Sequence, residues 1–492
     1  MRLDLRGLSI YPQHHKRSHI SGLDNAQDLQ YFTNISLGGE PFLVSIDTGS
    51  SDLWVAGIVP NSNDTGVSAS IQYAIGGVSG SVMTASLNFL DFNVSDQAYI
   101  QVQSSSAYPE RQGLLGLGPN VGSNIHVALK NQPTGDTVLD RIFRQDPSTP
   151  NALTILLSRS DDPGKTYPGQ ITVSDIVPGL ESILAQPKLP VKAVPSTQSG
   201  DQHWQALLDP NGIIGPDGQR IAMSTKVAGA PIPSQLTVVF DTGFSFSQVP
   251  KYVADAIYSR ISGAQFQNLT TTGPIWTLPC NAEVNTTLIF GNISLPIHPL
   301  DTSFNLQGPT GNQFCVGGFQ PITTGAAPDY DMILGMTFLR NVYLLVNYGD
   351  FVDGTATKAP PYVQLLSVTD PAAAHVDFVN TRLGGVDTTG FQVLINSSPS
   401  SSDSDYNGSD QQTRLIVIGG VASGCLLILL IAIVAYITLR RRHRRRRDTL
   451  LIHGAGPAPM LHSRAGTTDK PAELSEVDNS VPPPRYKERN SW

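Results

Sequence analysis

The sequence predicts an all-β protein of two similar lobes, followed by a single C-terminal transmembrane helix. Short β-branched runs alternate with Gly, Pro, Ser and Asn clusters up to residue 370, which is typical of strands joined by turns. One motif occurs twice in the same order, 194 residues apart. Residues 415–439 form an apolar run without a charge that is long enough to cross a bilayer. A chain of 492 residues has room for two or three domains.

The repeated motif is an Asp-Thr-Gly triplet that directly follows an apolar run. The first copy lies in FLVSIDTGSSDLWV at residues 42–55, and the second in VVFDTGFSFSQ at 238–248. Each copy is followed downstream by an apolar-Gly segment, GLLGLG at 113–118 and MILGMTF at 332–338. One Asp-Thr-Gly is common in turns, but two copies in the same order, each with its apolar partner, indicate an internal repeat.

The aspartates of this repeat, Asp47 and Asp241, are a candidate catalytic pair. Two carboxyl groups held close together cannot both ionise, so one keeps a proton while the other is charged. The charged partner can take a proton from water, and the neutral partner can polarise a carbonyl and protonate a leaving nitrogen. This chemistry hydrolyses amides at acid pH without a metal or cofactor, and we expect neither. The pair His14-His15 is interpreted as part of a solvated arm.

These motifs resemble those of the pepsin-like aspartic proteases, and the resemblance covers residues 30–370. It implies a bilobal fold with an active-site cleft between the lobes and one catalytic aspartate from each, Asp47 and Asp241. It also implies that the hydroxyls of Thr48 and Thr242 link the two catalytic loops. The apolar-Gly segments match those that pack behind each loop, around Leu115-Gly116 and Leu334-Gly335.

The residues that follow each threonine match the family pattern, with one departure. Gly49 and Gly243 let the backbone turn sharply and bring its N–H groups near the carboxylates. Ser50 matches a hydroxyl that hydrogen-bonds the adjacent carboxylate. Phe244 stands at the matching position of the second copy and cannot donate such a bond. We expect this change to raise the affinity of the pair for its proton, which gives a mildly acidic optimum without abolishing activity.

Residues 70–89 resemble the flap, a hairpin that covers the catalytic site in this family. Tyr73 matches the flap tyrosine, Gly76 matches a flap glycine, and Trp54 matches the tryptophan that supports the tyrosine. The flap reads Tyr-Ala-Ile-Gly where Tyr-Gly-x-Gly is commoner, which affects subsite preference rather than reaction class. The alternative is that Tyr73 is an ordinary cross-strand aromatic and Trp54 a plain core residue.

Composition shifts divide the chain into six segments. We expect the following boundaries: an N-terminal arm or prosegment remnant at 1–29, an N-terminal lobe at 30–195, a C-terminal lobe at 196–382, a Ser/Asp-rich stalk at 383–413, a transmembrane helix at 414–439 and a basic, then disordered, tail at 440–492. The dibasic pair Lys16-Arg17 resembles the end of a prosegment. The first 22 residues contain no apolar run of signal-peptide length, so we expect a signal upstream of them, the alternative being that the apolar span itself acts as a late signal. Helices should be short, for example at 251–261.

Charge separates the two sides of the apolar run. Residues 1–413 hold 19 Lys/Arg and 34 Asp/Glu, whereas residues 440–492 hold 12 Lys/Arg and 6 Asp/Glu. An acidic, Lys/Arg-poor region suits an acid medium and argues against nucleic acid as a partner. Ordinary solubility charge is the alternative. The run RRRHRRRR directly after the span predicts a cytoplasmic C-terminus and lobes on the extracellular or vacuolar-lumenal side, the cell surface being favoured.

Cysteines and sequons also predict a secretory protein. The resemblance implies a disulfide between Cys280 and Cys315, the alternative being two buried thiols; Cys425 lies within the apolar run. Every Asn-x-Ser/Thr sequon precedes residue 415, as expected for glycosylation in the lumen. These sequons are Asn34, Asn63, Asn93, Asn268, Asn285, Asn292, Asn396 and Asn407.

The leading functional hypothesis is a single-pass type I membrane protein that cleaves protein or peptide substrates as an aspartic endopeptidase. A catalytically silent, peptide-binding relative is the main alternative, and a structural surface scaffold is the third. Phe244 is the local argument against an enzyme. In the tail, Pro483–Tyr486 forms a Pro-Pro-x-Tyr pattern, a ligand type for WW domains.

Overall fold

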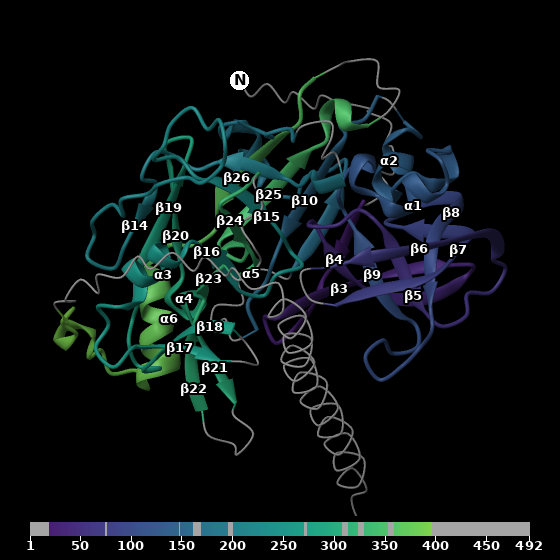
Figure 1. Ribbon diagram of the computed structural model, residues 1–492. Coiled ribbons are helices and arrows are strands. Elements are labelled where there is room, and N and C mark those ends of the chain that lie inside the picture. The colour runs from purple at the N-terminus through teal and green to yellow at the C-terminus, as the bar shows by residue number, and fades with distance from the viewer. Residues whose placement is uncertain are drawn as a thin grey trace, which may run out of the picture. The chain divides into compact units, whose positions relative to one another are not determined.

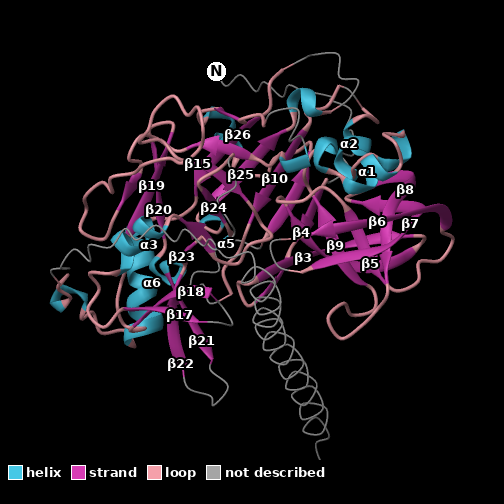
Figure 2. Ribbon diagram, in the orientation of Figure 1, coloured by secondary structure: helices cyan, strands magenta, loops and turns pink. Residues whose placement is uncertain are grey.

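The computed structural model describes most of the chain between residues 19 and 395. The described ranges are 19–73, 76–146, 148–160, 169–194, 200–269, 273–307, 313–322, 329–352 and 359–395. Strands predominate in them and most helices are short (Figure 1, Figure 2). The predicted β class is therefore confirmed for this part of the chain. The dibasic pair, most of the stalk, the apolar span and the tail lie outside the described residues.

The first half of the chain builds an eight-stranded sheet that carries the first Asp-Thr-Gly motif. In spatial order the strands are β2 (Asp24–Ala26), β3 (Gln30–Leu37), β4 (Glu40–Asp47), β9 (Gln112–Gly116), β5 (Leu53–Ala56), β8 (Phe92–Val102), β7 (Gly77–Phe89) and β6 (Asn63–Gln72). Alternate side chains of β4 face the core, among them Phe42, Val44 and Ile46. The antiparallel β6–β7 hairpin is the segment predicted as the flap.

The second half repeats this arrangement around the second motif. Its five-stranded sheet has the order β13 (Gln205–Leu207), β15 (Thr237–Phe240), β24 (Met332–Leu334), β16 (Ser247–Val249) and β23 (Phe319–Pro321). In the first half β4 pairs parallel with β9, β9 antiparallel with β5, and β5 parallel with β8. In the second half β15, β24, β16 and β23 pair in the same sequence of directions. The repeat seen in the sequence is therefore a repeat of topology.

A six-stranded sheet joins the two halves. Its order is β1 (Ile20–Gly22), β11 (Gln170–Val173), β10 (Ala152–Leu156), β25 (Val342–Asn347), β26 (Tyr362–Ser367) and β12 (Leu189–Pro190). The central pair is β10 with β25, which come from opposite halves of the sequence. Two smaller sheets complete the second half: β14 (Ile213–Ile214), β19 (Thr286–Phe290) and β20 (Ile293–Ile297), and β17 (Gln265–Leu269), β18 (Gly273–Leu278), β22 (Gln313–Gly317) and β21 (Ser303–Gln307).

The helices lie between the strands and at the C-terminal end of the described chain. They are α1 (Asn124–Ala128), α2 (Val138–Phe143), α3 (Lys251–Tyr258), α4 (Pro299–Thr302), α5 (Met336–Leu339) and α6 (Pro371–Leu383), with 3₁₀ turns η1 (Asn120–Gly122), η2 (Pro133–Gly135), η3 (Glu181–Ala185), η5 (Gly349–Phe351) and η6 (Thr389–Phe391). The helix expected at 251–261 is α3 and ends at Tyr258. Helix α6 begins at an Asp370 cap whose side chain accepts the Ala373 N–H, and ends at Gly384 with φ of 67°.

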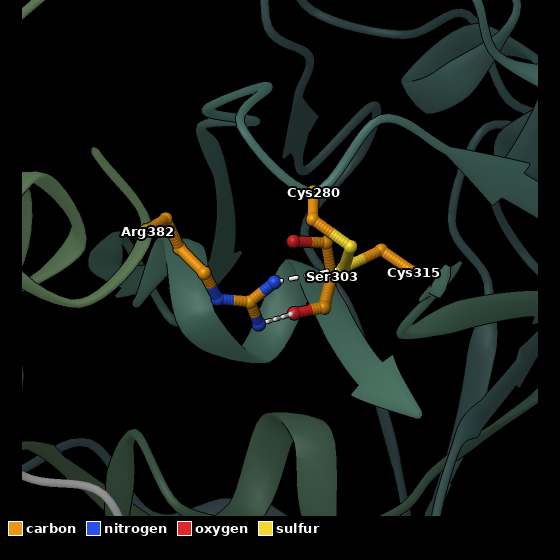
Figure 3. Close-up of a disulfide and its surroundings, with 4 residues drawn as sticks. All are labelled: Cys280, Ser303, Cys315 and Arg382. Atoms are coloured by element: carbon orange, nitrogen blue, oxygen red, sulfur yellow. Dashed lines mark hydrogen bonds between the residues drawn. A yellow bond between two sulfur atoms is a disulfide. The ribbon is translucent and has the colours of Figure 1, made fainter. Parts of the chain in front are cut away.

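The predicted disulfide between Cys280 and Cys315 is confirmed, with a Cα–Cα distance of 5.1 Å. It ties the turn after β18 to strand β22. Arg382 of α6 reaches this bridge and donates from Nη1 to Cys315 Sγ at 2.8 Å and from Nη2 to the Ser303 carbonyl at 2.9 Å (Figure 3). Helix α6 is thereby fixed against the disulfide-bearing sheet.

A buried ion network lies between the two halves. Arg340 is 1% exposed, and its Nε donates to Asp301 Oδ1 at 2.7 Å. Arg159 also pairs with Asp301, and Asn341 Nδ2 donates to its other oxygen at 3.0 Å. Arg340 Nη1 donates to the Asp28 carbonyl of the first half at 2.7 Å. Burial alone would raise the pKa of Asp301, but the guanidiniums of Arg159 and Arg340 hold it at about 2.

Within the ranges that the structure describes, no helix is both long and apolar enough to cross a membrane.

Candidate active site

The structure brings the two repeated motifs together at the junction of the two halves. Asp47 is the last residue of β4, and Asp241 directly follows β15. The backbone of each motif is held by the apolar-Gly strand of its own half. The Asp47 carbonyl accepts the Leu117 N–H at 2.7 Å, and the Asp241 N–H donates to the Leu334 carbonyl at 3.0 Å. The predicted packing of these segments behind each loop is therefore observed.

The glycine after each threonine allows the two carboxylates to approach. A Cβ atom added to Gly49 would lie 2.1 Å from Asp241 Oδ2, and one added to Gly243 would lie 2.7 Å from Asp47 Oδ1. Each glycine therefore lies directly against the aspartate of the opposite motif. The Gly49 N–H donates to Asp47 Oδ1 at 2.9 Å, and the Gly243 N–H to Asp241 Oδ1 at 2.6 Å. Any larger residue at either position would push the pair apart.

The two threonines form a reciprocal set of hydrogen bonds, as the sequence predicted. The Thr48 N–H donates to Thr242 Oγ1 at 3.0 Å, and the Thr242 N–H donates to Thr48 Oγ1 at 2.9 Å. Each hydroxyl then donates across the junction, Thr48 Oγ1 to the Phe240 carbonyl at 2.9 Å and Thr242 Oγ1 to the Ile46 carbonyl at 3.0 Å. Both threonines are buried, so all four bonds are shielded from water.

The electrostatic environment of the carboxylate pair favours a state in which the two aspartates share one proton. Burial and the neighbouring charge of Asp47 raise the pKa of Asp241 well above its ordinary value. The carboxyl groups of Asp47 and Asp241 are therefore close enough for the charge of one to affect the protonation of the other. The side chains are 5% and 6% exposed, while Gly243 is exposed beside them. A water molecule or substrate can therefore reach the pair, although the protein covers most of it.

The two aspartates differ in their hydroxyl donors. Ser50 Oγ donates to Asp47 Oδ2 at 2.5 Å. Phe244 occupies the corresponding place beside Asp241 and is half-buried. The next hydroxyl, on Ser245, donates instead to the Leu29 carbonyl at 2.7 Å. Because burial and the neighbouring carboxylate raise the pKa of Asp241, we assign the shared proton to Asp241.

Tyr73 and Trp54 meet above the first motif, as predicted. Trp54 Nε1 donates to Tyr73 Oη at 2.8 Å, and Tyr108 packs edge-on against the Trp54 ring at 5.4 Å. Burial first, and then the charge of Asp47, raise the pKa of Tyr73 above its ordinary value. Tyr73 is therefore near enough to Asp47 to be influenced by its charge. Gly76 has φ of 73° and closes the hairpin, its carbonyl accepting the Tyr73 N–H at 3.0 Å.

One residue at the site escaped the sequence reasoning. The imidazole of His203 lies near the first motif and packs edge-on against the Tyr330 ring at 6.0 Å. Burial lowers its pKa, while the charges of Asp201 and Asp47 act in the opposite direction. His203 lies directly before the buried Trp204, and no motif marks it. A lone histidine in a polar stretch gives no signal in a single sequence.

The predicted sequons within the described residues lie at the surface. The side chains of Asn34, Asn63, Asn93, Asn285 and Asn292 are exposed. The side chain of Asn268, together with Asn396 and Asn407, lies outside what the structure describes.

Comparison with known proteins agrees with this geometry. The family model for eukaryotic aspartyl proteases matches residues 30–65 and 194–357. Over these residues the chain is similar to the eukaryotic aspartyl proteases. It is 28% identical to the major aspartyl peptidase 1 of Cryptococcus neoformans, over 68% of this chain and 70% of the relative.

Two further relatives of this chain extend the comparison. It is 25% identical to the aspartic-type endopeptidase ctsD of Aspergillus fumigatus, over 76% of this chain and 74% of the relative. It is also 25% identical to pepsin A of Rhinolophus ferrumequinum, over 68% and 83% respectively. The predicted class of enzyme, an aspartic endopeptidase, is therefore confirmed.

Proposed function

We propose that this aspartyl protease is a membrane-tethered endopeptidase that hydrolyses peptide bonds at acidic pH through Asp47 and Asp241. The observation that carries the catalytic part is the mutual approach of the two motifs. Each glycine lies against the other motif's carboxylate, and four shielded threonine bonds fix the pair. The close approach of two buried carboxyl groups costs free energy, and a turn with only a structural role does not require it.

The mechanism follows from the asymmetry of the pair. Ionised Asp47 takes a proton from a water molecule as that water attacks the peptide carbonyl carbon. Protonated Asp241 transfers its proton to the carbonyl oxygen, which becomes a hydroxyl of the tetrahedral intermediate. The proton now on Asp47 then passes to the leaving nitrogen as the C–N bond breaks. A proton returns to Asp241 when the carboxyl product forms, so the pair is restored.

Flap closure would complete the site. We propose that a peptide lies between the two halves, beneath the β6–β7 hairpin. The Trp54–Tyr73 bond holds the flap tyrosine on the side of Asp47 and Ser50. Covering the reacting bond excludes water and strengthens each hydrogen bond to the transition state.

Replacing Asp47 or Asp241 with Asn tests the catalytic assignment. Either variant should lose turnover by roughly three orders of magnitude or more, since general acid–base catalysis is removed. A statine-type inhibitor should abolish the wild-type activity. Melting curves and circular dichroism of each variant control for folding. Substantial turnover of either variant across the whole pH range would refute the assignment.

Phe244 supports one competing function, that of a catalytically silent peptide-binding protein. Its ring gives Asp241 no hydroxyl donor, unlike Ser50 at Asp47. The endopeptidase remains favoured because both carboxylates, both glycines and both threonines keep their bonds. Peptide binding without turnover in the wild type, and turnover gained in Phe244→Thr, would establish the silent alternative instead.

The membrane tether is proposed from the sequence. The uncharged run 415–439, the arginines after it and the exposed sequons support a type I topology with the lobes outside or in a lumen. Protease treatment of sealed, lumen-inside vesicles should remove the tail and spare the lobes. Glycosidase treatment should reduce the apparent mass, and the variant Asn34→Gln should reduce it by one glycan. A protected tail would contradict the topology. The Pro483–Tyr486 pattern remains a proposed WW-domain ligand.

A further inference from the structure

The segment that leaves helix α6 is bound firmly to the second half of the protein. Gln392 Nε2 donates to the Asn281 carbonyl at 2.8 Å, and its Oε1 accepts the Glu283 N–H at 3.1 Å. The Ile395 N–H donates to the Arg260 carbonyl at 2.9 Å, and Leu394 packs against the core. These contacts place residues 389–395 along the outer edge of this half, at the yellow-green end of the described chain beyond α6 (Figure 1). Residues 389–395 fall within the range 383–413 for which composition predicts a polar stalk, and these contacts hold them against the protein.

The outward face of this segment is apolar. Gln392 bonds to the protein and Leu394 packs against its core, whereas Phe391, Val393 and Ile395 are 85%, 76% and 46% exposed. Val386, in the preceding turn, is 66% exposed. Large apolar side chains that are exposed close together on a surface mark a candidate interaction site. We name Val386, Phe391, Val393 and Ile395 the exit patch.

The carboxylates nearest to the exit patch are paired. Asp387 faces His375 Nε2 at 3.4 Å, and His375 Nδ1 contacts Glu283 at 3.0 Å. Asp217 pairs with Arg260 at 2.6 Å. These three carboxylates face one guanidinium and one imidazole, so the surroundings of the patch carry a small net negative charge, which disfavours an anionic partner and suits an apolar or zwitterionic one.

Chain connectivity decides what such a partner is. This inference rests on the proposed tether. Eighteen residues, 396–413, separate Ile395 from the predicted transmembrane span. A linker of that length has an end-to-end distance of roughly 25 Å on average. The surface around Ile395 is therefore the part of the lobes that the tether holds nearest to the bilayer. The high effective concentration makes even a small apolar contact with lipid productive.

We propose that the exit patch docks on the bilayer surface, with Phe391 and Val393 inserted among neutral or zwitterionic lipid headgroups. Docking would fix the orientation of the lobes above the membrane, so that the catalytic junction keeps a defined height and direction. Lys/Arg-poor lobes give no attraction to anionic lipid, and the apolar side chains supply the contact.

The test uses the full-length protein in nanodiscs of phosphatidylcholine. In a Cys425→Ser background, Phe391→Cys is labelled with an environment-sensitive thiol fluorophore. The matched control is Ile58→Cys, because Ile58 is an equally apolar residue, 79% exposed, on the other half of the protein. Both side chains are exposed, so neither substitution should disturb the fold; peptidase activity confirms this. We expect lipids with a headgroup-level quencher to quench the label at 391 at least twofold more than the label at 58.

Each alternative outcome overturns the proposal in a recognisable way. Equal lipid quenching at 391 and 58 in inserted protein would show that the patch does not touch lipid. A label at 391 that is shielded from aqueous iodide but not quenched by lipid would show that another protein or a second copy covers the patch. If alkaline carbonate extracts the protein from the nanodisc lipid, the proposed tether is wrong, and the docking proposal that rests on it is wrong too.

Discussion

Replacing Phe244 with Thr should give Asp241 the hydroxyl donor that Asp47 already has. Ser50 and Phe244 each lie three residues after their aspartate. The carbonyl oxygen of each accepts a backbone N–H from the apolar-Gly segment of its own half, Gly118 or Met336, at 2.8 Å in both cases. The two positions are therefore equivalent in backbone geometry. We expect the hydroxyl introduced by Phe244→Thr to reach the Asp241 carboxylate as the Ser50 hydroxyl reaches Asp47.

The direction and size of the effect follow from this contact. A hydrogen bond to a charged acceptor contributes about 1.5–3 kcal/mol, which corresponds to about one to two pKa units. The new donor favours ionised Asp241, so the raised pKa of Asp241 should fall. Because Asp241 must stay protonated for catalysis, the alkaline limb of the pH–rate profile should move to lower pH by about one unit or more.

The assay is kcat/KM for a fluorogenic peptide, measured across acid and neutral pH for the wild type, Phe244→Thr and Phe244→Leu. The Leu variant removes the ring without adding a donor, so it isolates the hydroxyl. Ser50→Ala is the converse change and should move the acid limb to higher pH, since it removes the donor from Asp47. A folded Phe244→Thr whose alkaline limb coincides with that of Phe244→Leu would refute the hydrogen-bond reasoning.

Three further changes test other parts of the structure. Asp301→Asn leaves Arg340 buried without its charge partner and should cost about 3–5 kcal/mol of unfolding free energy at neutral pH. The pKa of Asp301 falls from 3.8 to about 2 on folding. Its contribution to the free energy of unfolding is therefore complete above pH 3.8 and disappears as the pH falls through 2. Urea unfolding at several pH values should show that the stability difference between wild type and variant shrinks in strong acid. Because burial lowers the pKa of His203, its ring gains a proton only as the medium becomes more acidic, so the acid limb of the wild type should contain a step that His203→Gln lacks; coinciding acid limbs would leave His203 a structural residue. Replacing Cys280 and Cys315 together by Ser opens a 35-residue loop and should lower stability by about 4 kcal/mol in the chain-entropy model, with the melting temperature as the measurement and wild-type activity expected in the cold.

Much of the site was predictable because it repeats. Two short motifs in the same order predicted that Asp47 and Asp241 would meet, and the structure places each glycine against the opposite carboxylate. The resemblance also predicted the contact between Trp54 and Tyr73 and the disulfide, which the structure bears out. These features are local patterns or pairs of matching motifs, so they can be predicted from a single sequence.

Other features depend on partners that a sequence does not specify. Alternation predicts which face of a strand is buried, but not that β10 pairs with β25 across the two halves. The one clue to the buried network was Arg340 within the apolar run MILGMTFLRNVYLLV, a charge that burial makes costly unless it is paired. Its partner Asp301 lies in an unremarkable segment. Composition likewise does not reveal that Gln392 bonds to the Asn281 carbonyl and holds the segment after α6 against the second half.

The reciprocal threonine bonds set the order in which this enzyme can become active during synthesis. Thr48 completes its loop only with Phe240 and Thr242, and the strand behind Asp241 ends at Leu334. A nascent chain in which these residues are not yet synthesised carries one aspartate on a loop without its partner loop. The backbone N–H groups of that loop are then accessible to water. Peptidase activity therefore requires the last stage of folding, when the two newly made halves pack against each other. A chain that is still being synthesised is inactive.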